Sequence, residues 1–144
     1  MRRRTLTLEL GMTSVIVGIM FACAPVPKEM ETEKVSIVKP DDQGIQRTTI
    51  IMDSYLYSPK ELSVQAGKPV ELTLRNAATF LTHTFHLEDS AAGHHVHAEA
   101  KAGESQTVRF TPKEQGRFVF YCDKKFLFFK SHRERGQEGH LDVR

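Results

Sequence analysis

The stretch Gly116-Arg-Phe-Val-Phe-Tyr-Cys122 near the C-terminus decides the interpretation of this sequence. Its aromatic and β-branched residues predict a strand, and the strand ends at a cysteine. Residues 123–131 follow, and then His132, Gln137 and Gly139 lead into a second predicted strand over 139–144. A cysteine and a histidine loop between two strands therefore form a candidate site on a β-rich scaffold.

Upstream of this stretch the pattern is also that of strands. In residues 70–75, Val70, Leu72 and Leu74 alternate with polar residues, which is typical of a half-buried strand. Similar short runs occupy residues 47–52, 55–57, 61–65, 82–87 and 106–110, separated by turn residues, and no amphipathic helix of useful length occurs. Seven or eight short strands predict an all-β domain, an antiparallel Greek-key β-sandwich or barrel.

The N-terminus has the layout of an export signal. Three arginines at positions 2–4 precede an apolar run over 10–21, and Ala22 stands before Cys23. Residues 1–22 are expected to be a signal peptide, and the surroundings of Cys23 resemble a bacterial lipobox, in which that cysteine is the lipid anchor. Cleavage after Ala22 or Ala24 without lipidation is the alternative. We expect an exported protein, periplasmic or at the cell surface, anchored to the membrane as a lipoprotein.

Residues 23–43 are rich in proline and charge, and we expect a flexible tether there, with the folded domain over 44–144. The formal net charge is +2, and it falls to zero when residues 1–22 are removed with their three arginines and one glutamate. Such a balance gives no electrostatic support for nucleic-acid binding.

One internal cysteine, Cys122, remains, and a lone thiol in an oxidising compartment favours metal ligation over a buried structural role.

Two imidazoles, a thiolate and a weak fourth donor suit copper in both oxidation states. His83, Cys122, His132 and Gln137 supply that set. Across residues 48–143, an ordered series of short motifs resembles the cupredoxin (blue copper protein) family. The motifs, in chain order, are Gly67-Lys-Pro-Val, Asn76 with His83-Thr-Phe, Gly103-Glu-Ser with Val108-Arg-Phe, Gly116 to Cys122, and His132 with Gly136-Gln137-Glu-Gly139. The resemblance implies a small exported single-domain protein that binds one copper ion (Cu+/Cu2+), with His83, Cys122 and His132 as equatorial ligands and Gln137 in the axial position.

The sequence departs from the family pattern in two places. Glutamine replaces the usual axial methionine, and its harder oxygen donor is expected to favour Cu(II) and lower the reduction potential. Residues 123–131 separate Cys122 from His132, where two to four residues are usual. This longer loop either folds away from the site or rearranges it and displaces His132.

The remaining histidines leave two interpretations open. His94, His95 and His97 form a second metal site or an exposed polar loop, and His95 and His97 share a face if the segment is extended. His86 has the opposite strand parity to His83 and is expected to face solvent, and His140 is expected at the surface.

The run Phe126 to Phe129, flanked by lysines, is either a docking surface for an acidic partner or a membrane, or a cover over the metal.

These features predict one-electron transfer by a mononuclear type 1 copper protein, with the electron leaving through His132. We expect no enzymatic activity and no small-molecule substrate, a redox partner of the cytochrome or oxidase type, and membrane attachment through Cys23. Two alternatives are a periplasmic copper carrier or sensor that delivers copper to a partner protein, and a metal-free interaction module of the same fold.

Overall fold

The computed structural model describes residues 34–87, 93 and 95–144. The expected signal peptide, the anchor Cys23 and the histidine at position 94 lie outside these residues. No helix in the described part of the chain is long and apolar enough to cross a membrane.

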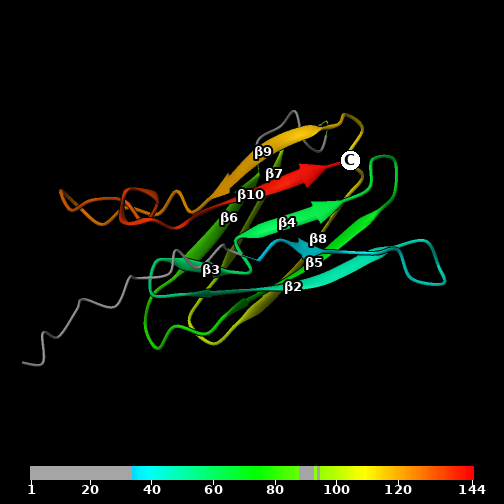
Figure 1. The fold of residues 1–144 in the computed structure, drawn as a ribbon. Helices are drawn as coiled ribbons and strands as arrows, with labels where there is room; N and C mark the ends of the chain where they lie inside the picture. Colours follow the sequence, from blue (N-terminus) through cyan, green and yellow to red (C-terminus); the bar gives the residue numbers. More distant parts are fainter. Residues whose placement is uncertain (1–33, 88–92, 94) are drawn as a thin grey trace, which may run out of the picture. The chain divides into compact units, whose positions relative to one another are not determined.

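Two β-sheets form the domain (Figure 1). The larger has the strand order β1-β4-β10-β9-β6-β7 and the smaller the order β3-β2-β5-β8. The strands are β1 (Ser36–Ile37), β2 (Gln46–Asp53), β3 (Leu56–Ser58), β4 (Glu61–Val64), β5 (Val70–Asn76), β6 (His83–Leu87), β7 (Val96–Ala100), β8 (Ser105–Phe110), β9 (Gly116–Tyr121) and β10 (Glu138–Val143). One turn of 3-10 helix, η1 (Arg133–Arg135), is the only helical element among the described residues.

The all-β prediction is confirmed, with ten strands instead of seven or eight. The two additional strands are β1, which has only two residues, and β7, whose alternating Val-His-Ala-Glu-Ala run lies in the histidine-rich stretch that was expected as a loop. The expected antiparallel pairing holds for β2 with β3, β5 with β8, β6 with β7 and β9, and β9 with β10, whereas β1 pairs with β4, β4 with β10 and β2 with β5 in parallel.

The folded domain also begins earlier in the chain than expected. Ser36 and Ile37 pair with β4, and Val38 donates its backbone N–H to the carbonyl of Ser63. The Val38 side chain is buried in the core. The β-branched residues of this short segment explain the difference, since they can bury apolar surface that a tether would leave in water.

The core lies between the two sheets. Along β5, Val70, Leu72 and Leu74 are buried, as their alternation predicts, while the residues between them are partly or fully exposed. The rings of Tyr57 and Phe120 meet edge to face with centroids 5.2 Å apart. Each large apolar side chain buried in this way contributes about 1.5–3 kcal/mol to folding. The rigid sandwich holds one end of β6, β9 and β10 in fixed register.

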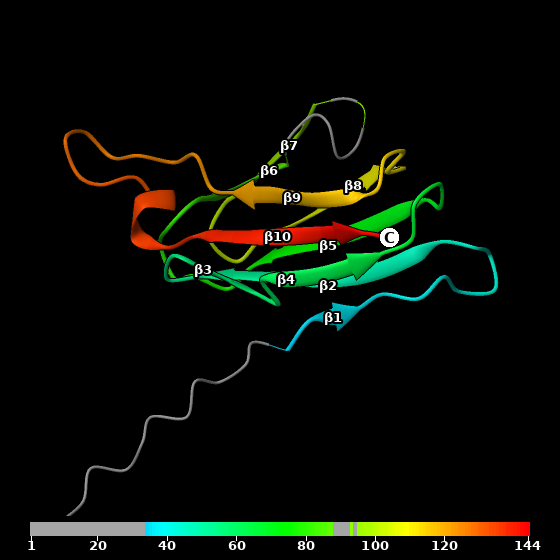
Figure 2. The same ribbon diagram turned by 45° about the horizontal axis from the view of Figure 1, so that its top comes forward.

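The candidate site lies at that end. Cys122 follows β9, Gln137 precedes β10, and His83 is the first residue of β6. The connection from β9 to β10, orange in Figure 2, extends past the ends of the strands and carries η1. Strands distant in sequence therefore bring the predicted ligands together at one end of the larger sheet, where β9 ends and β6 and β10 begin.

Candidate metal centre

Four side chains converge between the start of β6 and the β9–β10 connection. His83 Nδ1 lies 2.8 Å from Gln137 Oε1 and 3.2 Å from His132 Nδ1. Cys122 Sγ lies 3.4 Å from His132 Nδ1. All four residues are buried. The structure therefore brings together the whole set of ligands that the sequence predicts.

The spacing of these atoms suits a small metal ion. Metal–nitrogen bonds of about 2.0 Å at a tetrahedral angle place two donors roughly 3.3 Å apart, close to the separation of the two Nδ1 atoms. The atom of His83 that faces the other donors is Nδ1, whereas its buried Nε2 has no hydrogen-bond partner among the described residues. The spacing of the converging donor atoms therefore fits a ligand set.

The protonation of the two imidazoles also suits ligation. Burial lowers the pKa of His83, and the hydrogen bond to Gln137 offsets part of this effect. Burial likewise lowers the pKa of His132, and the neighbouring His83 lowers it further. Both rings are therefore neutral near pH 7, and a neutral imidazole is the form that binds a metal.

The long loop after Cys122 folds outward and leaves the site assembled. Two backbone hydrogen bonds join the ends of the loop at its base: His132 N donates to Lys124 O at 2.8 Å, and Cys122 N donates to Gln137 O at 3.1 Å. Gly136 ends η1 with φ 104°, a left-handed conformation that glycine adopts readily, and the chain then turns into β10. Residues 125–131 thus form a loop that protrudes from this hydrogen-bonded base, and His132 lies beside Cys122.

Three residues support the site; Thr84 and Asp123 were given no role from the sequence, and Asn76 was named only as part of a family motif. The backbone N–H of Thr84 donates to Cys122 Sγ at 3.3 Å, and its hydroxyl lies 3.3 Å from Sγ and 2.7 Å from Asp123 Oδ1. Asn76 Nδ2 donates to the carbonyls of Leu81 and Ala100, fixing the loop that leads to His83. Thr84 and Asp123 could have been found from their positions in the sequence, because each directly follows a predicted ligand.

His132 is the site residue nearest to the surface, with 8% of its area exposed. The Tyr55 ring meets it edge to face at 4.8 Å. Two hollows are both lined by Phe126 and His132, and their other lining residues are mainly aromatic and cationic. Phe126, Leu127, Phe128 and Phe129 are exposed by 67%, 70%, 84% and 48%. The run is therefore largely open to solvent, while Phe126 and Phe129 line a hollow that reaches His132.

A second group of ligand atoms lies on the outer face of the same sheet. His86, His97 and Asp123 place one ligand atom each within 4.8 Å of one another. His95, from the predicted tract, has its ring centroid 4.8 Å from that of His86 and 5.9 Å from that of His97. His86 does face away from His83, but it is half-buried. His140 is also only partly exposed and lies 2.9 Å from Glu61 Oε1.

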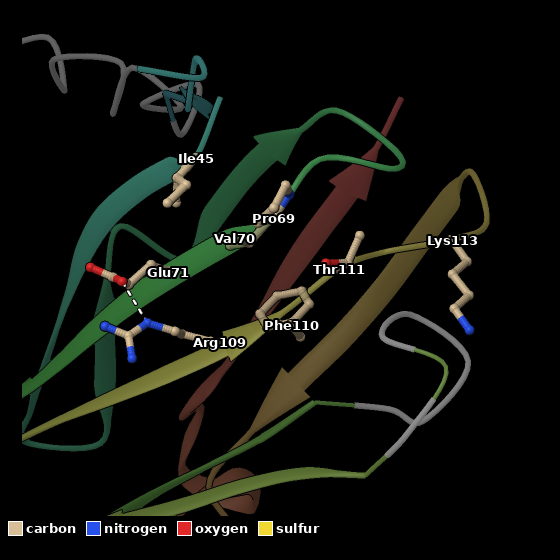
Figure 3. Close-up of a pocket in the computed structure, with 8 residues that line it drawn as sticks. All are labelled: Ile45, Pro69, Val70, Glu71, Arg109, Phe110, Thr111 and Lys113. Carbon is tan, nitrogen blue, oxygen red and sulfur yellow. Dashed lines mark hydrogen bonds and ion pairs between the residues drawn. The ribbon is translucent and has the colours of Figure 1, made fainter. Parts of the chain in front are cut away.

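A pocket at the other end of β5 has a different character (Figure 3). Glu71 and Arg109 point toward each other, with Lys113 apart from them, and Arg109 Nε donates to Glu71 Oε2 at 2.6 Å. This pairing is the largest influence on the Glu71 carboxyl and lowers its pKa. The pocket has no thiol or imidazole in its lining, which consists of Ile45, Pro69, Val70, Glu71, Arg109, Phe110, Thr111 and Lys113.

Comparisons with known proteins agree with this architecture. The family model of the cupredoxin-like domain matches residues 13–137. The chain belongs to the cupredoxin-like domain family. No curated protein matches the sequence.

Three solved structures share the fold at low sequence identity. Auracyanin from Roseiflexus castenholzii has a TM-score of 0.57 and 21% identity, with 68% of this chain and 96% of that chain covered. Auracyanin A, a blue copper protein from Chloroflexus aurantiacus, has a TM-score of 0.56 and 17% identity, covering 70% and 100%. The metal-binding domain of the Cu(I)-exporting P-type ATPase CopA from Streptococcus pneumoniae D39, solved with Cu(I), has a TM-score of 0.56 and 23% identity, covering 77% and 96%.

Proposed function

We propose that this protein is a mononuclear type 1 copper protein that acts in one-electron transfer. The observation that carries the proposal is the convergence of two imidazole nitrogens, one thiol sulfur and one amide oxygen at one buried position. Copper held there supplies one-electron chemistry by alternating between Cu(I) and Cu(II). His83, Cys122 and His132 are the equatorial ligands in this proposal, and Gln137 is the axial ligand.

The surrounding residues hold this donor set in place. The Gln137 amide nitrogen lies 3.5 Å from the carbonyl of Leu56, which turns Oε1 toward His83. The Thr84 N–H donates to Cys122 Sγ, and such a donor stabilises a thiolate. These supports come from different strands of the sandwich, and we expect them to limit the movement of the ligands when the charge of the site changes. A site that reorganises little suits electron transfer.

The surface around His132 supports a protein partner. The exposed aromatic run lies beside His132, and Lys125 and Lys130 flank it. An exposed apolar patch of this kind is typical of an interaction site. We infer an acidic redox protein, of the cytochrome or oxidase type, that places its own centre close to the His132 edge.

The electrostatic part of this proposal is tested with a small anionic oxidant. The Lys125→Glu/Lys130→Glu variant is expected to react several-fold more slowly at low ionic strength, because local cations raise the encounter rate with anions. The difference shrinks as salt is added. Lys68→Glu/Lys113→Glu carries the same charge change at the far end of β5 and serves as the control. Equal rates for the two double variants would contradict the docking surface.

Copper delivery is the second candidate function. The observation that favours it is the outer group of His86, His97 and Asp123, which lies in the same sheet as His83. A carrier releases copper to a competing apo-protein within the time of a mixing experiment, whereas an electron carrier retains it. We expect retention, because the four proposed donors are buried.

The proposed cellular setting follows from the sequence. Export through residues 1–22 and lipidation at Cys23 would hold the domain at a membrane surface, in the periplasm or at the cell surface. Metabolic labelling with a fatty acid, compared between the wild-type chain and Cys23→Ser, tests the anchor. Labelling that persists in the variant would contradict it.

A further inference from the structure

We propose a second metal site on the outer face of the larger sheet, formed by His86, His97 and Asp123, that takes a borderline divalent ion such as Zn²⁺ or Cu²⁺. The proposal concerns residues other than the four buried donors and does not depend on what the buried site binds.

Strand register places the two imidazoles side by side. His86 on β6 pairs directly with His97 on β7, and on its other side it pairs with Tyr121 of β9. Side chains directly opposite each other on adjacent strands have Cβ atoms about 4.5–5.5 Å apart. The ring centroids of His86 and His97 are 5.8 Å apart, and the His86 ring stacks on that of Tyr121 at 4.7 Å. Three adjacent strands therefore fix the position of His86.

The carboxylate is oriented toward these rings. Asp123 Oδ1 accepts the Thr84 hydroxyl at 2.7 Å, and its other oxygen, Oδ2, lies 3.1 Å from His97 Nε2. The Asp123 backbone N–H in turn donates to the Thr84 hydroxyl oxygen at 3.1 Å. A carboxylate held through one oxygen, with the other turned toward an imidazole, is a typical arrangement for a metal ligand and its supporting hydrogen bond.

The types of ligand in this group determine which metal ions it favours. Two imidazoles and one carboxylate are common ligands of zinc and copper, whereas calcium and magnesium prefer oxygen ligands alone. The groups are half-buried or exposed, so an ion can reach them from solvent. The His95 ring, 4.8 Å from that of His86, is positioned to add a fourth nitrogen.

The test is a calorimetric titration of Zn²⁺ into the metal-free full chain carrying Cys122→Ser and His132→Gln. These two changes weaken the buried site, so that the outer site dominates the measured binding. One Zn²⁺ per chain is expected. Adding His97→Gln or His86→Gln is expected to weaken that binding by more than the roughly 10–100-fold that loss of a supporting residue costs.

His140→Gln is the matched control, since His140 lies on β10 of the same sheet beside a carboxylate of Glu61. It should leave the zinc affinity unchanged. Circular dichroism melting curves identify any variant that fails to fold, and histidine ring shifts of the unsubstituted chain on zinc addition provide a second measurement. Unchanged affinity in both the His86 and His97 variants, or zinc-induced shifts confined to other histidines, would overturn the proposal.

Discussion

At the residue scale, Gln137 determines the electronic character of the proposed copper site. Its side chain is fully buried, and its oxygen lies 2.8 Å from His83 Nδ1. An amide oxygen is a harder donor than a thioether and favours the more oxidised ion. Methionine has a similar length and flexibility, so it fits the same space.

Gln137→Met is therefore expected to raise the reduction potential of the copper-loaded protein. We predict an increase of more than about 59 mV, equivalent to a tenfold change in the ratio of Cu(I) to Cu(II) affinity. Cyclic voltammetry measures it, and Gln106→Met on the exposed surface of β8 is the control. A potential that falls or does not move would contradict the axial role of Gln137.

At the scale of elements, β10 can return from the site only because its second residue is glycine. A Cβ atom at Gly139 would lie 2.4 Å from the Phe120 ring and 2.5 Å from the backbone carbonyl of Lys60. The ring is fully buried in the core and the carbonyl belongs to the main chain, so neither can move aside freely.

Gly139→Ala should destabilise the protein by about 1–3 kcal/mol, the usual cost of overpacking a core. Chemical denaturation of the metal-free protein measures the free energy of unfolding. Thr107→Ala, at an exposed position of the edge strand β8, is expected to change it by no more than about 0.5 kcal/mol. A similar small change in Gly139→Ala would show that β10 shifts to accept the methyl group.

At the scale of the whole molecule, the stability of the metal-free fold should depend on pH through the two buried imidazoles. Burial lowers the pKa of both His83 and His132 in the folded state, whereas both have a pKa near 6.5 when unfolded. Below that pH the unfolded chain binds protons that the folded chain does not. Stability is therefore fully present above about pH 6.5 and declines as the pH falls toward the lowered values.

Denaturation of the metal-free protein at pH 7.5, 6.5 and 5.5 tests this dependence. The free energy of unfolding should fall across the series, and the fall should be shallower in His132→Gln. This range lies above the ordinary carboxyl pKa values, so groups such as Glu71 and Asp123 contribute little to the slope. A flat profile in the wild-type chain would contradict the account of the buried imidazoles.

Much of this architecture could be predicted from the sequence because it depends on local patterns. The alternation of Val70, Leu72 and Leu74 predicted β5, and the order of His83, Cys122, His132 and Gln137 predicted the residues that the structure brings together. The parallel pairing of β2 with β5 could not be predicted, because pairing is a long-range property. Asp123 and His86 were missed as neighbours of His97 for the same reason, since only the register of β6 with β7 and β9 brings them together.

The visible absorption spectrum of the full chain loaded with Cu(II) tests whether the buried donors form a type 1 copper site. Wild-type protein is expected to show a strong thiolate-to-copper charge-transfer band, and Cys122→Ser is expected to lose it because the variant has no thiolate at the site. A weak Cu(II) spectrum that Cys122→Ser leaves unchanged would contradict the type 1 assignment and direct attention to the outer histidines as the copper ligands.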